Sequence, residues 1–218
     1  MKNLVQNYFF SLRRGMRLFL LVFLLGFPAA WLGQRLQWFN LYDWLALTPA
    51  LVWKGQVWRL VTYAFLPLSF WDWIFTLFWL ATLVAVLSRD WSARGFWGYC
   101  LLGALSGGLF VSLLRPGLQS GLVGGGAMIF ALLVAWDWTY RHERLNLLGI
   151  GEMSVRQVAV LITVINSLFL FFGTGWFLML AMWCGGVVGW LWLRIRTKRL
   201  LGQTPQQVRS ERVARLEL

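Results

Sequence analysis

The stretch GLVGGGAMIF, from Gly121 to Phe130, places three consecutive glycines at the start of an apolar helical segment. Each glycine inside a helix costs roughly 1 kcal/mol relative to alanine, so helix stability alone does not explain the run. A glycine run at this place indicates that another part of the chain comes very close to this backbone. The composition and the other glycines of the chain predict which part that is.

The composition is that of a membrane protein. Of 218 residues, 59% are apolar and 13% are charged, and the mean hydropathy is +0.64, far from the balance of soluble domains. The 16 tryptophans agree, because indoles collect where hydrocarbon meets lipid headgroups. The two cysteines, Cys100 and Cys184, lie in separate apolar segments and favour neither a disulfide framework nor a metal site. We therefore expect an integral membrane protein without a cofactor or metal.

Six segments approach the length of about 20 apolar residues that a membrane-spanning helix needs. The first is long and has no clean small-residue cleavage site, so we interpret it as a retained helix rather than a signal peptide. The pattern predicts an all-α polytopic membrane protein with a six-helix domain over residues 16–195, flanked by segments 1–15 and 196–218. The predicted spans are 16–33, 71–88, 96–114, 122–140, 157–173 and 175–193.

The basic residues predict the orientation of these spans. A formal net charge of +12 is compatible with nucleic acid or with anionic lipid as partner, so the positions of the cations decide. With the amino terminus inside, 16 of the 20 lysines and arginines are cytoplasmic, and only Arg35, Lys54, Arg59 and Arg115 are outside. This bias predicts two cytoplasmic termini in a lipid bilayer and makes a nucleic-acid partner unnecessary. The short loops favour a bacterial plasma (inner) membrane.

Two polar segments flank or interrupt the spans. The connection 34–57 is rich in Trp and Leu but too broken by polar residues to cross a membrane. It is either interfacial, with one or two short half-immersed helices, or a loop packed on the bundle. In the basic tail, Thr204 as N-cap, Pro205 at the first helical position and Gln207 predict a short cytoplasmic helix.

Pairs of glycines four residues apart lie in the third and sixth predicted spans and at the start of the fourth. Helices in lipid associate through small residues that let backbones approach, and GxxxG spacing is typical of such contacts. The pairs predict close packing, above all between the fourth and sixth helices. They are Gly103 with Gly107, Gly121 with Gly125, and Gly185 with Gly189.

Taken together, residues 16–195 resemble the rhomboid superfamily of intramembrane serine proteases and their inactive relatives, including the derlins. The resemblance rests on six spans, a bulky first loop, the stretch GQVWRLVTYAF before the second span, the glycine-rich start of the fourth and the GxxxG of the sixth. Its most specific part is the pair Trp58 and Arg59 with Thr62. The resemblance implies that this pair braces the first loop.

The resemblance also implies where a catalytic serine and histidine should lie, and both are missing. The nucleophile position falls on Gly126, followed by Ala127 where the motif has glycine. The position of the general base falls on Met182 or, one residue later, on Trp183. The only histidine, His142, lies 16 residues after Gly126, about 24 Å along a helix and beyond reach for proton transfer.

The positions that the resemblance assigns to oxyanion binding fall on Asp72 and Thr76. An ionised carboxylate only accepts hydrogen bonds, so Asp72 opposes the negative charge of acyl transfer. Loss of one donor from such a site typically costs about 2.7–4 kcal/mol. A Ser-Lys pair is not available either, since Lys2, Lys54 and Lys198 lie at or beyond the predicted membrane edges.

We therefore expect a catalytically inactive rhomboid-like protein that binds transmembrane segments of client proteins, as the resemblance implies for inactive relatives. Asp72, Asp137 and Asn166 are the polar residues in or near the spans that are able to meet a client. For Asp137 an ion pair with Arg141 is the better interpretation, and for Asp72 a helix cap competes with client contact. The alternatives are an active rhomboid endopeptidase with an unrecognised dyad, and a structural membrane subunit or transporter. The sequence does not predict the oligomeric state.

Overall fold

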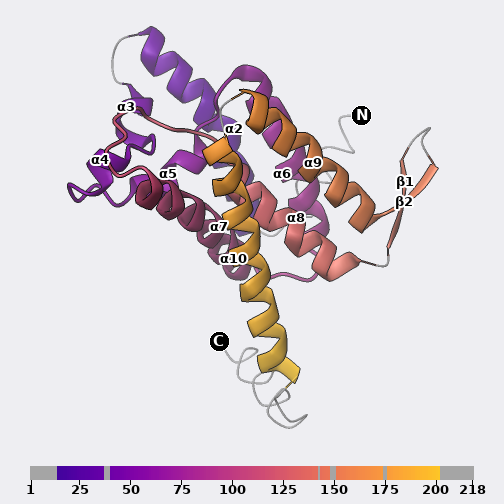
Figure 1. Ribbon diagram of the computed structural model, residues 1–218. Coiled ribbons are helices and arrows are strands. Elements are labelled where there is room, and N and C mark those ends of the chain that lie inside the picture. Colours follow the sequence, from indigo (N-terminus) through magenta and orange to yellow (C-terminus); the bar gives the residue numbers. More distant parts are fainter. Residues whose placement is uncertain (1–13, 37–39, 142, 148–150, 174–175, 202–218) are drawn as a thin grey trace, which may run out of the picture.

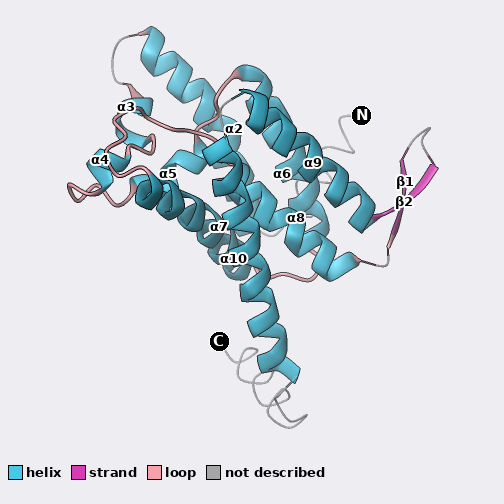
Figure 2. Cartoon of the chain, in the orientation of Figure 1, coloured by secondary structure: helices cyan, strands magenta, loops and turns pink. Residues whose placement is uncertain are grey.

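The computed structural model describes residues 14–36, 40–141, 143–147, 151–173 and 176–201. His142 and the predicted helix that starts at Thr204 lie outside these residues. Helices make up most of the described chain (Figure 2). The long helices are α2 (Arg14–Arg35), α6 (Phe70–Leu87), α7 (Ala93–Leu114), α8 (Gly126–Tyr140), α9 (Val155–Gly173) and α10 (Trp176–Leu201).

Each of the six predicted apolar segments forms one of these helices. Four helices are long and apolar enough to cross a membrane, namely those over Gly15–Gly33, Phe70–Leu87, Ala93–Leu114 and Leu178–Thr197. Helix α8 and the apolar part of α9, Val155–Leu168, are shorter. The structure therefore agrees with a mostly helical membrane protein, and crossing by all six helices stays a prediction.

Helix α8 lies at the centre of the bundle and packs against α6, α7, α9 and α10 (Figure 1). Its apolar residues surround the helix on all sides instead of forming one stripe, which is typical of a helix buried among others. Leu132, Ala131 and Ala135 are fully buried, and Trp136 is nearly so. A helix that is enclosed in this way is held by the shapes of its neighbours.

Small residues bring α7 against α8. A Cβ atom added at Gly103 would lie 2.9 Å from the Cβ of Ala131, and one added at Gly107 would lie 2.5 Å from the Cβ of Ala127. Real Cβ atoms do not approach within such distances, so only glycine fits at both positions. Since lipid supplies no hydrophobic force between helices, this backbone proximity stabilises the pair through van der Waals contact.

Helix α10 packs on the other side of the same two alanines. A Cβ at Gly185 would collide with the carbonyl oxygen and Cα of Ala127, and one at Gly189 would lie 3.2 Å from the Cβ of Ala131. The hydroxyl of Tyr99 donates to the carbonyl oxygen of Ala131 at 2.8 Å and ties α7 to the same turn. Ala127 and Ala131 therefore lie between the glycine pairs of α7 and α10.

Gly121 and Gly125 play a different part from the one that the sequence predicts. Gly124 has a φ of +127°, so α8 begins only at Gly126 and both glycines precede it. A Cβ at Gly121 would lie 3.1 Å from the Cβ of Ala46, and one at Gly125 would lie 3.0 Å from the carbonyl oxygen of Ala64. They face the first loop, and Ala127 takes their predicted place against α10.

The first loop folds into short helices that pack on the bundle. These are α3 (Leu41–Leu45), α4 (Pro49–Val52), α5 (Arg59–Thr62) and the 3-10 helix η1 (Tyr63–Phe65), of which α3 and α4 fall within the predicted connection 34–57. Leu47 and Leu122 exchange two backbone hydrogen bonds of 2.8 Å, which join the loop to the glycine run. The loop therefore packs on the bundle, while its half-immersion in lipid stays a prediction.

A β-hairpin between α8 and α9 was not predicted. Strands β1 (Arg144–Leu147) and β2 (Gly151–Ser154) pair antiparallel, with Arg144 opposite Ser154 and Leu147 opposite Gly151. Arg144 and Glu152 form an ion pair of 3.3 Å across the strands. The hairpin projects from the start of α9 at one edge of the molecule (Figure 1). Its strands are too short to show a clear two-residue period in the sequence.

The substitution Gly185→Leu tests the close packing of α8 and α10. The new side chain would overlap the backbone of Ala127, which cannot move without displacing all of α8. Overpacking of this kind costs about 1–3 kcal/mol or more, so we expect a lower free energy of unfolding in detergent. Val187→Leu on the 52% exposed face of the same helix is the control and should unfold like the wild type. Equal losses in both variants would contradict the packing described here.

Candidate functional site at the start of helix α8

The glycine turn sets the position of the first residue of α8. The amide of Gly124 donates to the carbonyl oxygen of Tyr63 at 3.2 Å, which fixes the turn on the first loop. Gly126 then faces α10, where a Cβ on it would lie 3.8 Å from Cγ of Met182. Met182 is only 4% exposed. The structure thus brings together the nucleophile position and one of the two alternatives for the base position.

Trp183, the other alternative, points elsewhere. Its side chain is 43% exposed, and its Nε1 donates to the Ser167 hydroxyl of α9 at 3.1 Å. Its ring packs edge-on against Phe130 with centroids 5.1 Å apart. An indole donates but does not accept, and a thioether is only a weak acceptor. Neither side chain can remove a proton from a nucleophile at neutral pH.

Asp72 caps helix α6. Its Oδ2 accepts from the amide of Leu68 at 2.8 Å, and its own amide donates to the Ser69 hydroxyl at 3.2 Å, so the two side chains satisfy free donors at the helix start. Tyr42 of α3 lies close by, where burial and, to a lesser degree, the Asp72 carboxylate raise the pKa of its phenol. Thr76 is buried one turn further along α6. This geometry favours the cap over client contact for Asp72.

Arg59 is 3% exposed and holds the first loop through three hydrogen bonds. Its Nη1 donates to the carbonyl oxygen of Ala46 at 2.7 Å, and its Nη2 donates to that of Asp43 at 2.5 Å. Its Nε donates to Oε1 of Gln56 at 2.6 Å. A buried guanidinium is stable only when its donors are used in this way.

The residues beside Arg59 attach to the same short helix of the loop. Trp58 is 45% exposed, and its Nε1 donates to the carbonyl oxygen of Trp44 at 3.3 Å. The hydroxyl of Thr62 donates to the carbonyl oxygen of Leu45 at 2.8 Å. The chain around α5 therefore satisfies the free carbonyl groups at the end of α3, a role that helix ends require.

Two further polar residues of the spans have distinct surroundings. Asp137 forms an ion pair of 3.6 Å with Arg141, which confirms the predicted contact over one helical turn. Asn166 donates from Nδ2 to the carbonyl oxygen of Ile162 at 2.9 Å. Its spacing places it on the same face of α9 as the buried Ala159 and Ile162, yet Asn166 is exposed. The buried face of α9 therefore becomes exposed at Asn166, although the neighbouring Ser167 still bonds Trp183 of α10.

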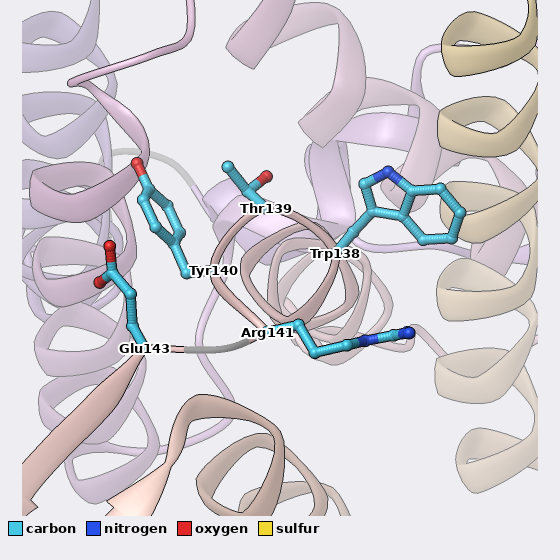
Figure 3. A pocket seen from close by; sticks show the side chains of 5 residues that line it. All are labelled: Trp138, Thr139, Tyr140, Arg141 and Glu143. Carbon is cyan, nitrogen blue, oxygen red and sulfur yellow. The ribbon is translucent and has the colours of Figure 1, made fainter.

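A hollow of about 440 Å³ surrounds the carboxyl end of α8. Figure 3 shows that its side chains point to different sides of the helix end, with Tyr140 and Glu143 on one side and Trp138 and Arg141 on the other. The Tyr140 hydroxyl is already bound, at 2.5 Å from Oδ2 of Asp90 and 3.0 Å from the Val86 carbonyl oxygen. The polar groups do not converge on one point, so we assign no ligand to this hollow.

One family model matches residues 16–208, from within α2 to beyond the end of α10. The description of this family is eukaryotic integral membrane protein (DUF1751). This description supports a membrane protein and gives no support to the predicted bacterial plasma membrane. No curated protein matches the chain.

The substitution Arg59→Ala tests the bracing of the first loop. It leaves the carbonyl groups of Ala46 and Asp43 without these donors, at a cost of about 1–3 kcal/mol for each buried group. We expect a lower free energy of unfolding and faster proteolysis within residues 41–58. Arg59→Lys should recover part of the stability, because an ammonium group retains donors but not the planar fork.

Arg35→Ala provides the matched control for Arg59. Arg35 is exposed, and its guanidinium lies 5.8 Å from the ring of Trp31, an arrangement worth about 0.5–1 kcal/mol at exposed sites. If Arg59→Ala were no less stable than Arg35→Ala, the bracing role would be refuted.

Proposed function

The chain belongs to the family of integral membrane proteins that matches residues 16–208, and we propose that it is a rhomboid-like protein without proteolytic activity that binds transmembrane segments of client proteins. The observation that carries the proposal is that Gly126 faces Met182, since a Cβ atom added at Gly126 would lie 3.8 Å from Cγ of Met182. These are the positions where the rhomboid resemblance implies a serine and a histidine.

The chemistry of this pair argues against peptide hydrolysis. Acyl transfer by a serine requires a hydroxyl within about 3 Å of a base that takes its proton. Gly126 has no side chain, and Met182 has a thioether that does not titrate. Met182 is buried and its side chain faces Gly126, so an apolar side chain lies where the base would stand. The position supports packing and provides no acid or base.

The bonds of Asp72 add to this argument. An oxyanion site needs donors directed at the developing negative charge. The Asp72 carboxylate is an acceptor, and its Oδ2 is engaged with the amide of Leu68. Its negative charge also opposes an oxyanion near the start of α6. Stabilisation of the transition state at this place is therefore unfavourable.

The arrangement of α6 and α9 supports client binding. Both helices pack on α8 but have little direct contact with each other, which leaves a side of the bundle where a further helix can approach α8. Phe75 and Phe78 of α6 are 61% and 60% exposed and are suited to an apolar helix in lipid. We propose that a client transmembrane helix packs at this side.

Asn166 provides a polar contact for such a client. A side-chain amide in an apolar helix is costly in lipid unless it finds hydrogen-bond partners, and helices in membranes associate through such groups. Its Nδ2 donates to the carbonyl oxygen of Ile162, while its carbonyl oxygen is an acceptor that a client side chain can use. We propose this acceptor as a contact for a polar residue of the client helix.

The charges of the bundle support an orientation in which the carboxyl end of α10 lies in the cytoplasm. Tyr140 at the end of α8 binds Asp90, and the rings of Trp91 and Trp192 lie 6.1 Å apart, so the turn after α6 and the end of α10 share one end of the bundle. Lys54 and Arg115 belong to the opposite end, where Trp53 binds the Ser112 carbonyl oxygen. Following the positive-inside rule, we propose that this end is cytoplasmic, with Arg89, Arg94, Arg141, Arg194 and Arg196.

Labelling with a fluorophosphonate probe tests the absence of catalysis. We expect no labelled serine in the wild type and no cleavage of a transmembrane substrate in proteoliposomes. Labelling of any wild-type serine, or substrate cleavage, would overturn the proposal.

Designed dyads test the geometry of the site. Gly126→Ser with Met182→His places a hydroxyl and an imidazole on facing positions, whereas Gly126→Ser with Trp183→His directs the imidazole towards α9. General base assistance is worth on the order of 10²-fold or more, so the first variant should be labelled faster by that order. Equal labelling rates would show that Met182 does not face Gly126.

Photocrosslinking in native membranes tests client binding. A diazirine amino acid at Asn166 should trap other membrane proteins, because this position borders the open side of α8. The same probe at Val160, which is 55% exposed on another face of α9, is the control and should trap mainly lipid. If both positions trap only lipid at natural expression levels, client binding at this site is refuted.

A further inference from the structure

A groove of about 420 Å³ lies on the face of α9 that points away from the bundle, beside the β-hairpin. We propose that this groove binds one anionic phospholipid, with its phosphate at Arg156 and an acyl chain along the apolar part. The proposal is independent of client binding, since it concerns an outward face of α9 that does not include Asn166. The groove is lined by Met153 of β2 and by Arg156, Gln157, Val160, Leu161 and Val164 of α9.

The apolar part of the groove follows one stripe of the helix. Arg156, Val160 and Val164 are spaced by four residues and therefore line up along α9. At 1.5 Å per residue the stripe extends about 12 Å from Arg156 into the apolar segment. Met153 is half-buried, packs against the core of the bundle and forms the wall on the side of the hairpin. The groove therefore has a length and an apolar lining that suit a hydrocarbon chain.

The polar end of the groove has one uncommitted cation. Gln157 is engaged in the cap of α9. Its side-chain Oε1 accepts from the backbone amide of Ser154 at 2.9 Å, and its backbone amide donates to the Ser154 hydroxyl at 3.3 Å. Glu152 is paired with Arg144 at 3.3 Å. Among the residues that the structure describes, no ion pair joins Arg156 to a carboxylate. Its guanidinium is therefore available to an external anion.

The position of Arg156 at the start of α9 also favours binding of an anion. It is the second residue of α9, where the positive end of the helix dipole disfavours a cation. Helix stability therefore does not explain an arginine at this position. A phosphate beside it would be favoured both by the guanidinium and by the positive end of the helix.

A phospholipid matches the order of groups along the groove. In a membrane the charged end of α9 lies near the headgroups and its apolar stripe in the hydrocarbon, so one molecule with a phosphate and an acyl chain meets both parts. A partner transmembrane helix would need an acidic residue at the membrane edge together with a narrow apolar face. The continuity from cation to apolar groove favours lipid.

Native mass spectrometry of the full-length protein tests the proposal by titration with phosphatidylglycerol and with phosphatidylcholine of the same acyl chains. We expect the wild type to retain one phosphatidylglycerol about tenfold more tightly than one phosphatidylcholine, as a charge-assisted phosphate contact would give. Arg156→Gln should remove this preference, and Arg156→Lys should retain part of it. Arg194→Gln is the control for loss of charge, because Arg194 is exposed over Trp190 on α10 and away from the groove.

A second variant tests the acyl chain independently of charge. Val160→Trp should fill the groove and weaken both lipids while Arg156 is unchanged, and millimolar inorganic phosphate should not displace the bound lipid. Unchanged unfolding temperatures establish that each variant is folded. The proposal is overturned by equal retention of both lipids in the wild type, by equal effects of Arg156→Gln and Arg194→Gln, or by a protein partner in place of lipid on this face.

Discussion

The fold depends on the contact between the backbone of α8 and the glycines on either side of it. Ala127 lies between Gly107 of α7 and Gly185 of α10, and neither glycine could carry a side chain without displacing α8. In lipid there is no hydrophobic driving force between helices, because the acyl chains are as apolar as the side chains. Close backbone contact of this kind is therefore a main source of helix association. The central position of α8 follows from it, since a helix enclosed on two sides by glycine cannot tilt or rotate freely.

The same contact determines the geometry of the candidate site. Gly126 directly precedes Ala127, and Met182 lies three residues before Gly185, so the packing of Ala127 on Gly185 also brings Gly126 to face Met182. The first loop supports the arrangement from the other end through Arg59 and through the bond from Gly124 to Tyr63. The packing at these two positions rests on the bare backbone of Gly126 and the apolar side chain of Met182, and it requires no acid, base or nucleophile there.

Helix α9 presents two faces with different surroundings. Its inner face is buried at Ala159 and Ile162 and becomes exposed at Asn166. Its outer face combines the cation of Arg156 with an apolar groove. Since a membrane exposes one helix to protein on one side and to lipid on the other, the two proposals assign to each face the partner whose chemistry it matches.

Composition and local spacing were sufficient to predict the apolar helices and the ion pair of Asp137 with Arg141, because hydropathy and the 3.6-residue helical period act along one segment. Which of Met182 and Trp183 faces Gly126 could not be predicted, since adjacent residues of a helix point about 100° apart and the answer depends on the rotation of α10 against α8. Only the tertiary structure decided that Gly121 and Gly125 face the first loop, because the positive φ of Gly124 delays the start of α8. Such outcomes depend on how separate segments dock, and docking is a property of their three-dimensional shapes.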